Sequence, residues 1–436
     1  MDYRVKFADG PLQIDVEVPG SKSITNRALL MAAMAQGESV LEGVLKSDDS
    51  MYFLQALIDL GFSVEEDEQN KQVRIVGQQG RIPRDEAEIF VGSAGTAARF
   101  LTAFLAMNAG TYRIDAAQQM KKRPMAELLQ ALRELGAQIE CTEQADTFPM
   151  IVRGIKENRD RGAVSLNIDK SSQYLSALLM TAPLRFGQLE ITLTGDREAR
   201  SYVRMTEQMM VQFGHPGVER LSENVYRVPR GYYQGRSYQI EPDVSAACYF
   251  YAMAAVTGGS AVVKRMRRDS LQGDMRFLEI LEKMGCRLSW EPGESGAQQL
   301  RLTAPPPGKL LGFEASFADF SDQALTAAGI APFADSPVTI TGIGHIRGQE
   351  SDRIHVIATE LGRMGIVCEE RDDSVRILPG KPHGARIRTY NDHRVAMAFA
   401  VTGLRAEGIV IEDCECCKKT FPEYFQMLDQ ITAGKA

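Results

Sequence analysis

The chain has 436 residues, of which 44% are hydrophobic and 25% are charged, the balance of an ordinary globular protein. Lysine and arginine number 50 against 57 aspartates and glutamates, which gives a net charge of −7. This charge argues against a general nucleic-acid-binding surface, because such a surface needs a basic excess. It does not exclude a small basic pocket for an anionic metabolite.

The composition also bears on compartment and metal content. No run of about 18 apolar residues predicts a membrane span, and the first ten residues, MDYRVKFADG, are untypical of a signal or transit peptide. The seven cysteines are expected to be reduced thiols of a cytoplasmic protein. The alternative is a soft-metal site at Cys414, Cys416 and Cys417, but the sequence suggests no fourth ligand, so we expect no metal.

One pattern recurs six times along the chain. A polar turn leads into a short, almost wholly apolar helical stretch, and a strand-like run follows. The stretches begin 71 to 77 residues apart, near Ser23, Gly95, Ser172, Ser245, Ser321 and Asp392. A helix that is apolar on all sides must be buried, so these six stretches are predicted to form the cores of a repeat protein.

A second helix in each repeat is of a different kind. Residues 125–136 and 275–285 carry apolar side chains at three-to-four spacing with charges between them, which is typical of a surface helix. Glycines that suit a left-handed helix end follow such stretches at Gly61, Gly136, Gly214, Gly285 and Gly365. Each repeat is therefore predicted to be strand, buried helix, strand, amphipathic helix, strand. Six repeats give two similar halves that divide near residues 241–243, and nothing assigns residues 1–19 to either half.

Polar residues gather at the starts of the buried helices, where unpaired N–H groups and the helix dipole attract anions. Ser23 is predicted to be the N-cap of the first helix. Arg394 enters an otherwise apolar helix, and a buried cation needs a partner. Capping or surface ion pairing explains each feature taken alone. Their equivalent places in both halves favour one anion-binding function.

The motifs at these places resemble those of one known family. The chain has PGSKSITNR at 19–27, GSAGTAARFLTA at 92–103, Arg-Pro at 123–124, SSQYLSALLMTAP at 171–183, SLQGDMRF at 270–277, ESDR at 350–353, YNDHRVAMAF at 390–399 and KTFPEYF at 419–425. Together they resemble the 5-enolpyruvylshikimate-3-phosphate synthases of the enolpyruvyl transferase family, over residues 12–431. The relatives that use UDP-N-acetylglucosamine share the fold. They typically have Lys-Asn in place of Lys22-Ser23, however, and commonly a loop cysteine that residues 115–122 lack.

The resemblance implies a two-domain α/β (α+β) fold, an inside-out α/β barrel with three βαβαββ units per domain. Residues 20–242 form one domain in this expectation. Residues 1–19 and 243–436 form the other, and a double crossover hinge lets the two close over the substrates.

The resemblance also implies the reaction. The 5-hydroxyl of shikimate-3-phosphate adds to C2 of phosphoenolpyruvate while C3 is protonated, and loss of phosphate from the tetrahedral adduct gives 5-enolpyruvylshikimate-3-phosphate. This step belongs to the shikimate pathway of chorismate and aromatic amino acid biosynthesis. It needs no metal or organic cofactor, and the family resemblance suggests a monomer that binds neither nucleic acid nor membrane. The two phosphates and two carboxylates of the substrates carry about −5 to −6 in total, which suits a cationic site.

Residue roles follow from the matched motifs. Phosphoenolpyruvate is expected to bind Lys22, Gly95, Arg123, Gln173, Arg353, Arg394 and Lys419. Shikimate-3-phosphate is expected to bind Lys22, Ser23, Arg27, Ser171, Ser172, Gln173, Tyr202, Asp322 and Gln349. Asp322 is our choice for the base at the 5-hydroxyl, and Glu350 and Lys22 match positions for proton transfer at C3. The sequence leaves open whether Asp322 and Glu350 exchange roles between steps.

Several positions depart from the family pattern. Ala199 replaces a phosphate-binding serine, and His345 and Gln349 stand where Asn and Lys are common. Affinity for shikimate-3-phosphate is therefore expected to be lower, unless Arg200 or Arg347 compensates.

The glyphosate response is a separate question. Gly95 is retained, which predicts that this inhibitor fits beside it. Phe100 replaces a common proline and Ser93 a common asparagine, and Phe100 is expected to shift its helix and weaken inhibition.

Two other functions stay open on the sequence alone. One is the UDP-N-acetylglucosamine enolpyruvyl transferase activity. The other is a non-catalytic anion-binding protein, which the departures at Ala199 and Gln349 favour and the retained Lys22, Asp322 and Glu350 oppose.

Overall fold

A computed structural model describes residues 1–195 and 200–434 of the chain. These residues divide into two compact units, which we call unit 1 (Met1–Pro19 with Glu241–Ala436) and unit 2 (Gly20–Ile240). The N-terminal segment joins the C-terminal half through two strand pairings. Strand β2 (Gln13–Val16) lies parallel to β15 (Ser260–Val263), and β1 (Tyr3–Arg4) lies antiparallel to β23 (Val410–Ile411).

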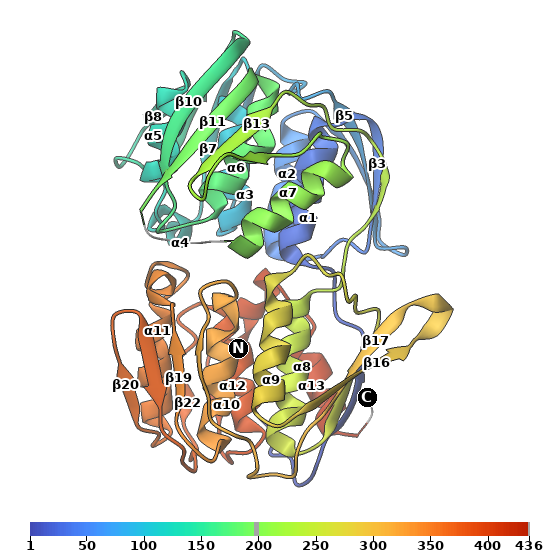
Figure 1. The fold of residues 1–436 in the computed structure, drawn as a ribbon, viewed down its shortest axis with the longest axis vertical. Coiled ribbons are helices and arrows are strands. Elements are labelled where there is room, and N and C mark those ends of the chain that lie inside the picture. The colour runs from blue at the N-terminus through green and yellow to red at the C-terminus, as the bar shows by residue number, and fades with distance from the viewer. Residues whose placement is uncertain (196–199, 435–436) are drawn as a thin grey trace. The chain divides into compact units, whose positions relative to one another are not determined.

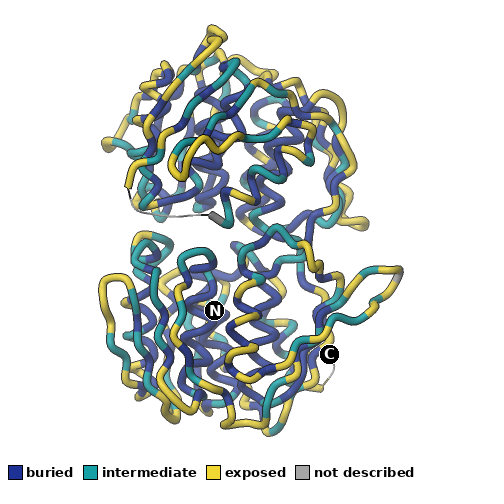
Figure 2. The backbone as a smooth tube through the Cα atoms, viewed as in Figure 1, coloured by how far each residue is buried: buried dark blue, intermediate teal, exposed yellow. Residues whose placement is uncertain are grey.

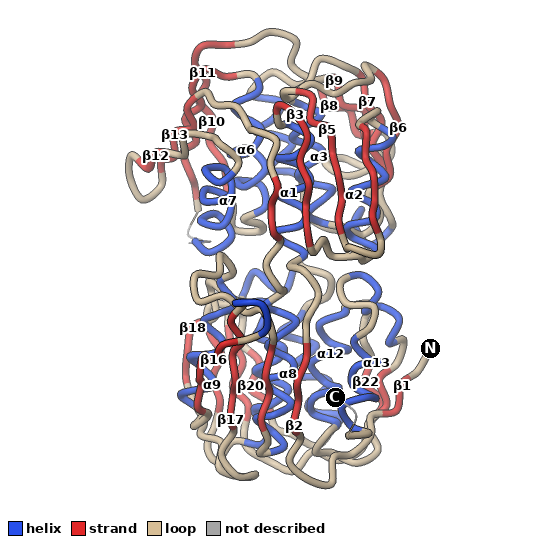
Figure 3. Tube along the Cα trace, turned by 90° about the vertical axis from the view of Figure 1, so that its right-hand side faces the viewer, coloured by secondary structure: helices blue, strands red, loops and turns tan. Residues whose placement is uncertain are grey.

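Unit 2 contains three four-stranded sheets that share one order. In each, a parallel pair of strands is followed by two antiparallel pairings. The sheets are β14 (Ser237–Gln239), β3 (Gln36–Glu42), β5 (Gln72–Gln78), β4 (Ser63–Asp67); β6 (Glu86–Phe90), β7 (Thr111–Asp115), β9 (Met150–Arg153), β8 (Gln138–Cys141); and β10 (Arg159–Asn167), β11 (Phe186–Thr194), β13 (Val225–Pro229), β12 (Glu219–Arg220). Figure 3 shows the β3 and β5 strands of the first sheet side by side.

Unit 1 repeats this order in two four-stranded sheets, and its third sheet keeps the parallel pairing and one antiparallel pairing. Its sheets are β2, β15, β17 (Gln298–Thr303), β16 (Arg287–Pro292); β18 (Glu314–Ser316), β19 (Val338–Thr341), β21 (Ser374–Ile377), β20 (Cys368–Glu370); and the three-stranded β22 (Arg386–Ile387), β23, β1. The recurrence of one strand order confirms the sixfold repeat and the predicted inside-out α/β fold class.

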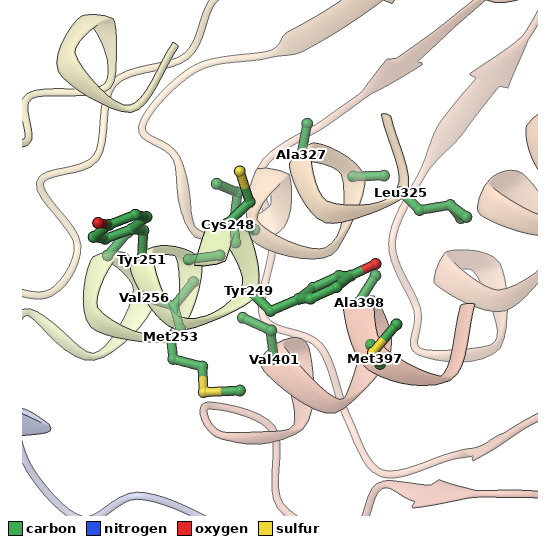
Figure 4. Packing of buried hydrophobic residues seen from close by; sticks show 14 of the residues in the cluster. Cys248, Tyr249, Tyr251, Met253, Val256, Leu325, Ala327, Met397, Ala398 and Val401 are labelled. Carbon is green, nitrogen blue, oxygen red and sulfur yellow. The ribbon is translucent and has the colours of Figure 1, made fainter. Parts of the chain in front are cut away.

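The six predicted apolar stretches form buried inner helices (Figure 1). They are α1 (Lys22–Met34), α3 (Gly95–Ala106) and α6 (Gln173–Thr181) in unit 2, and α8 (Val244–Thr257), α10 (Ala324–Ile330) and α12 (His393–Gly403) in unit 1. Every residue of α3 and of α12 is buried. Small side chains let the three helices of unit 1 pack together. Figure 4 shows Tyr249 of α8, Leu325 of α10 and Ala398 of α12 in this core.

The predicted amphipathic stretches form outer helices that bury one face. They include α2 (Asp48–Asp59), α5 (Ala126–Glu134), α7 (Arg200–Gln212), α9 (Arg276–Lys283), α11 (Arg353–Arg363) and α13 (Tyr424–Thr432). The mixture of buried and exposed residues along α9 is visible in Figure 2. All five predicted glycine helix ends are confirmed, with φ between +80° and +110° at Gly61, Gly136, Gly214, Gly285 and Gly365. Within the described ranges, no helix is both long enough and apolar enough to cross a membrane.

Candidate active site

In unit 2, the start of α1 places Lys22 beside a carboxylate. The prediction that Ser23 caps this helix is wrong, because α1 begins at Lys22 and Ser21 is its N-cap. The Lys22 Nζ lies 3.5 Å from Asp49 Oδ2, and Asp49 is only 2% exposed near the start of α2. Asp49 is not among the predicted site residues, since an acidic residue in the first turn of an outer helix is already explained by the helix dipole.

Arg27 is buried between three helices. Its Nε donates to Thr206 Oγ1 at 2.8 Å and its Nη2 to Ser176 Oγ at 3.2 Å, while Nη1 and Nη2 also reach the carbonyls of Ser23 and Tyr202. Its guanidinium carbon lies 5.2 Å from the centre of the Phe100 ring. All four of these bonds go to neutral oxygens, and burial lowers the pKa of Arg27 to about 10. A buried cation held by neutral groups favours an incoming anion.

A second arginine, Arg99, ties the starts of α3 and α6 together. Its Nη1 donates to Gln173 Oε1 at 2.7 Å, and its Nη2 donates to the Pro124 carbonyl at 3.0 Å. The Gln173 amide lies 3.5 Å from Thr96 Oγ1 at the start of α3. Arg99 thus holds Gln173, a predicted substrate-binding residue, and the turn that carries Arg123.

Gly95 is required where Arg123 passes over the start of α3. A Cβ built on Gly95 would lie 2.5 Å from Arg123 Nη1 and 2.8 Å from its Cζ. The glycine therefore leaves the room that the guanidinium occupies. This places the predicted pair of Gly95 and Arg123 in direct proximity.

The remaining predicted residues of unit 2 lie near the same helix starts. Ser171 Oγ accepts from the Gln173 backbone N–H at 3.3 Å, and Ser172 is the N-cap of α6. The Tyr202 carbonyl accepts from Arg27 and from Thr206. Since Arg27 and Arg99 link α1, α3 and α6 near their N-termini, unit 2 gathers cations and polar groups at one end of its inner helices. Such an end suits phosphate and carboxylate groups.

In unit 1, Arg353 is the centre of an ion-pair cluster. Its side chain is 1% exposed. Its Nη1 lies 3.0 Å from Asp322 Oδ1, its Nη2 lies 3.0 Å from Glu350 Oε2, and its Nε lies 2.8 Å from Asp392 Oδ2. It also contacts the Gln349 side-chain oxygen.

Two more cations extend the cluster. Arg394 Nη2 lies 2.8 Å from Asp322 Oδ2, and Lys419 Nζ lies 3.1 Å from Glu350 Oε1. The five predicted residues therefore alternate in sign, in the order Lys419, Glu350, Arg353, Asp322, Arg394. Counting Asp392, three cations face three carboxylates. An anion that arrives here meets cations already engaged, so its binding must loosen some pairs or protonate a carboxylate.

Two buried carboxylates of unit 1 were missed by the sequence analysis. Asp392 is fully buried and caps α12, where it accepts from the Arg394 backbone N–H at 3.0 Å and from Ser351 Oγ at 3.0 Å. Asp274 accepts from Gln323 Nε2 at 2.9 Å. Burial, together with the nearby Asp322 charge, raises the pKa of Asp274 to about 6. The motifs SLQGDMRF and NDHR contain both residues, but not their side-chain partners Gln323, Ser351 and Arg353.

The departures from the family pattern have mixed outcomes. His345 Nε2 lies 2.8 Å from Ser321 Oγ, beside the turn that carries Asp322. Arg347 binds Asp352, Glu370 and the carbonyls of residues 371 and 372 through its three nitrogens, which argues against its compensating for a missing cation. Ala199 and the side chain of Arg200 lie outside the described residues.

The cysteines show no metal-binding arrangement in the structure described. No group of three or more His, Cys, Asp or Glu side chains that could hold a metal occurs among the described residues. The Cys417 thiol lies 3.6 Å from the His393 carbonyl, and burial raises its pKa.

Comparison with known proteins gives a consistent result. A family model described as EPSP synthase (3-phosphoshikimate 1-carboxyvinyltransferase) matches residues 8–428. A 3-phosphoshikimate 1-carboxyvinyltransferase of Nostoc punctiforme is 42% identical over 96% of this chain and 97% of its own length. The chloroplastic 3-phosphoshikimate 1-carboxyvinyltransferase of Arabidopsis thaliana is 38% identical over 96% of this chain and 82% of its own. The solved EPSP synthase from Acinetobacter baumannii aligns with a TM-score of 0.81 at 27% identity, over 99% of this chain and 98% of that one.

Proposed function

The chain belongs to the EPSP synthase (3-phosphoshikimate 1-carboxyvinyltransferase) family, and we propose that the side chains gathered in its two units carry out that family's reaction. The reaction moves the enolpyruvyl group of phosphoenolpyruvate to the 5-hydroxyl of shikimate-3-phosphate and releases phosphate, within the shikimate pathway. The observation that supports the residue roles best is the cluster around Arg353, because it places two ionisable carboxylates, Asp322 and Glu350, against three cations.

Shikimate-3-phosphate is assigned mainly to unit 2. Its proposed ligands are Lys22, Ser23, Arg27, Ser171, Ser172, Gln173 and Tyr202, together with Asp322 and Gln349 of unit 1. Support comes from the shared location of the unit 2 residues near the starts of α1 and α6, and from the neutral surroundings of the Arg27 charge.

Phosphoenolpyruvate is assigned to residues of both units. Its proposed ligands are Lys22, Gly95, Arg123 and Gln173 of unit 2, and Arg353, Arg394 and Lys419 of unit 1. An arginine fork binds carboxylate and phosphate oxygens in pairs. Arg353 already binds both carboxylate oxygens of Asp392 in this way, and Arg394 binds one oxygen of Asp322, so the substrate would compete for both arginines.

The proton steps balance with two carboxylates. Asp322 accepts the proton of the 5-hydroxyl as its oxygen bonds to C2, and Glu350 donates a proton to C3. In the second step Glu350 takes a proton back from C3, and phosphate leaves with the proton that Asp322 holds. Lys22 remains the alternative group at C3, and the roles of the two carboxylates can exchange between steps.

The charge of the cluster favours a protonated Glu350 in the complex. In the cluster around Arg353, three cations and three carboxylates cancel. A bound phosphoenolpyruvate adds about two to three negative charges, and nearby negative charge raises the pKa of a carboxyl group. Glu350 is only 8% exposed, so this effect is weakly screened there.

We also propose that the protein works as a monomer in the cytoplasm. The seven cysteines are free thiols, which suits a reducing compartment.

The test uses the purified full chain with phosphoenolpyruvate and either shikimate-3-phosphate or the UDP-sugar, and follows phosphate release. We expect phosphate release when the acceptor is shikimate-3-phosphate and none when it is the UDP-sugar. Release with the UDP-sugar alone would replace the proposed acceptor. No phosphate release with either acceptor would favour the non-catalytic anion-binding alternative.

A further inference from the structure

The turn that leads into α12 has an unusual backbone. Tyr390 and Asn391 are consecutive non-glycine residues in the left-handed region, with φ of +54° and +55°. This conformation is unfavourable for residues other than glycine, so contacts with neighbouring groups must stabilise it. The next residue is Asp392, and Arg394 follows in the first turn of α12.

A buried glutamate on α11 binds this turn. Glu360 is fully buried, and its Oε1 accepts from the Tyr390 hydroxyl at 2.7 Å. Its Oε2 accepts from the Arg388 backbone N–H at 3.2 Å. Burial and the Glu360 carboxylate raise the pKa of Tyr390, which keeps this hydroxyl a donor. Glu360 Oε1 also pairs with Nε of the partly exposed Arg363, at 3.3 Å.

The same helix binds the turn at a second point. Arg353 precedes Glu360 by seven residues, which is about two helical turns, so both side chains leave the same face of α11. Arg353 bonds both carboxylate oxygens of Asp392, at 2.8 and 3.2 Å. Asp392 in turn accepts from the Arg394 backbone N–H. Two contacts with α11 therefore flank the left-handed residues Tyr390 and Asn391. Glu360 binds Tyr390 on one side, and Arg353 binds Asp392 on the other.

We propose that Glu360 is a positioning residue of the reaction: by binding the 388–390 segment, it fixes Asp392, and through Asp392 it presets Arg353 and Arg394 for phosphoenolpyruvate. Nothing places Glu360 in contact with substrate, so its effect passes through the turn. This inference rests on the proposed function, which assigns Arg353 and Arg394 to phosphoenolpyruvate.

The two contacts of Glu360 can be changed separately. Glu360→Gln keeps the size of the side chain, but only one of its two terminal atoms accepts, so either Tyr390 or the Arg388 N–H loses its acceptor. Tyr390→Phe removes the hydroxyl alone and keeps the ring. Arg363→Gln is the matched control, because it removes the ion pair between the partly exposed Arg363 and Glu360 and leaves both turn contacts in place.

The experiment measures kcat and both KM values for the full-length variants, with melting temperatures. We expect Glu360→Gln and Tyr390→Phe to raise the KM for phosphoenolpyruvate about fivefold to twentyfold. We expect the KM for shikimate-3-phosphate to stay within about twofold and kcat to fall less than about threefold. Arg363→Gln should match the wild type in all three constants.

The outcomes distinguish the inference from its premise. If wild type is inactive with the two substrates, the proposed function fails. Another outcome is an active wild type while both variants have its KM for phosphoenolpyruvate and a lower melting temperature. In that case Glu360 is only structural and the inference is overturned. Equal rises in both KM values would also overturn it. If Glu360→Gln does not fold, Tyr390→Phe decides alone.

Discussion

Replacing Glu350 by glutamine separates proton transfer from binding. Glu350 lies 3.0 Å from Arg353 Nη2 and 3.1 Å from Lys419 Nζ, and it is 8% exposed. Glutamine keeps the shape and can accept a hydrogen bond from either cation, but it cannot donate a proton to C3. We therefore expect turnover to fall far more than substrate binding.

The magnitudes follow from the cluster. General acid catalysis contributes about 10²–10⁴ in rate, which corresponds to about 3–5 kcal/mol at 1.36 kcal/mol per factor of ten. The affinity for phosphoenolpyruvate should stay the same or increase. Each ion pair at about 3 Å is worth on the order of 5 kcal/mol at an effective dielectric constant of 20, and this attraction competes with phosphoenolpyruvate for Arg353 and Lys419. Removing it should leave the KM for phosphoenolpyruvate equal or lower. The fold should survive, because Arg353 keeps Asp322 and Asp392.

The assay is steady-state phosphate release, with Glu412→Gln as the matched control. Glu412 is also paired with an arginine, at 3.0 Å from Arg386 Nε, but it is a third exposed and belongs to neither proposed binding set. The control should keep wild-type kcat. A kcat for Glu350→Gln within about threefold of wild type would refute the proton-transfer role, and a KM that rises as much as kcat falls would indicate a structural one.

Three further predictions follow from individual contacts. Gly95→Ala should raise the KM for phosphoenolpyruvate about tenfold or more, because its Cβ would displace the Arg123 guanidinium and a bond to a charged group is worth about 1.5–3 kcal/mol; an unchanged KM would contradict this. Phe100→Leu removes the ring under Arg27, a contact worth about 0.5–2 kcal/mol, so the KM for shikimate-3-phosphate should rise at least twofold; an unchanged glyphosate inhibition constant would end the idea that Phe100 sets sensitivity. Asp274→Asn should alter the pH dependence of melting. Burial and the Asp322 charge raise the pKa of Asp274 to about 6 in the folded chain, so the stability that its neutral form contributes is present at low pH and is lost as pH rises through 6. The melting temperature of the variant should therefore rise relative to that of the wild type between pH 4 and pH 7. A difference in melting temperature that is constant over this range would count against the buried charge.

Much of the fold was predictable because it repeats. Six apolar stretches at a regular spacing can only be buried helices, and five glycines identified the ends of the outer ones. The choice between Ser21 and Ser23 as N-cap was not predictable, since both serines suit the position and the tertiary structure decides between them.

The cations of the site were easier to predict than the acids that hold them. A lysine or arginine in an apolar stretch stands out, whereas Asp49 and Asp392 each have an ordinary explanation as a helix-start or capping residue. Their cationic partners, Lys22 and Arg353, lie 27 and 39 residues away on other elements. Sequence shows that a cation needs a partner, but only the packing of α1 with α2, and of α11 with the start of α12, shows which carboxylate supplies it.

The route of the chain has a consequence for synthesis. Unit 2 is an inserted domain: the chain leaves unit 1 after Pro19 and returns at Glu241, where the Asp243 N–H donates to the Pro19 carbonyl at 2.8 Å. During translation, β2 has no partner strand until β15, 247 residues later, has been synthesised. Residues 20–240 emerge as one continuous segment and can complete their sheets first. The two ends of the insertion lie close together, so the gene could be divided after residue 19 and before residue 241. One piece would encode the continuous unit 2, and the other would join the two segments of unit 1.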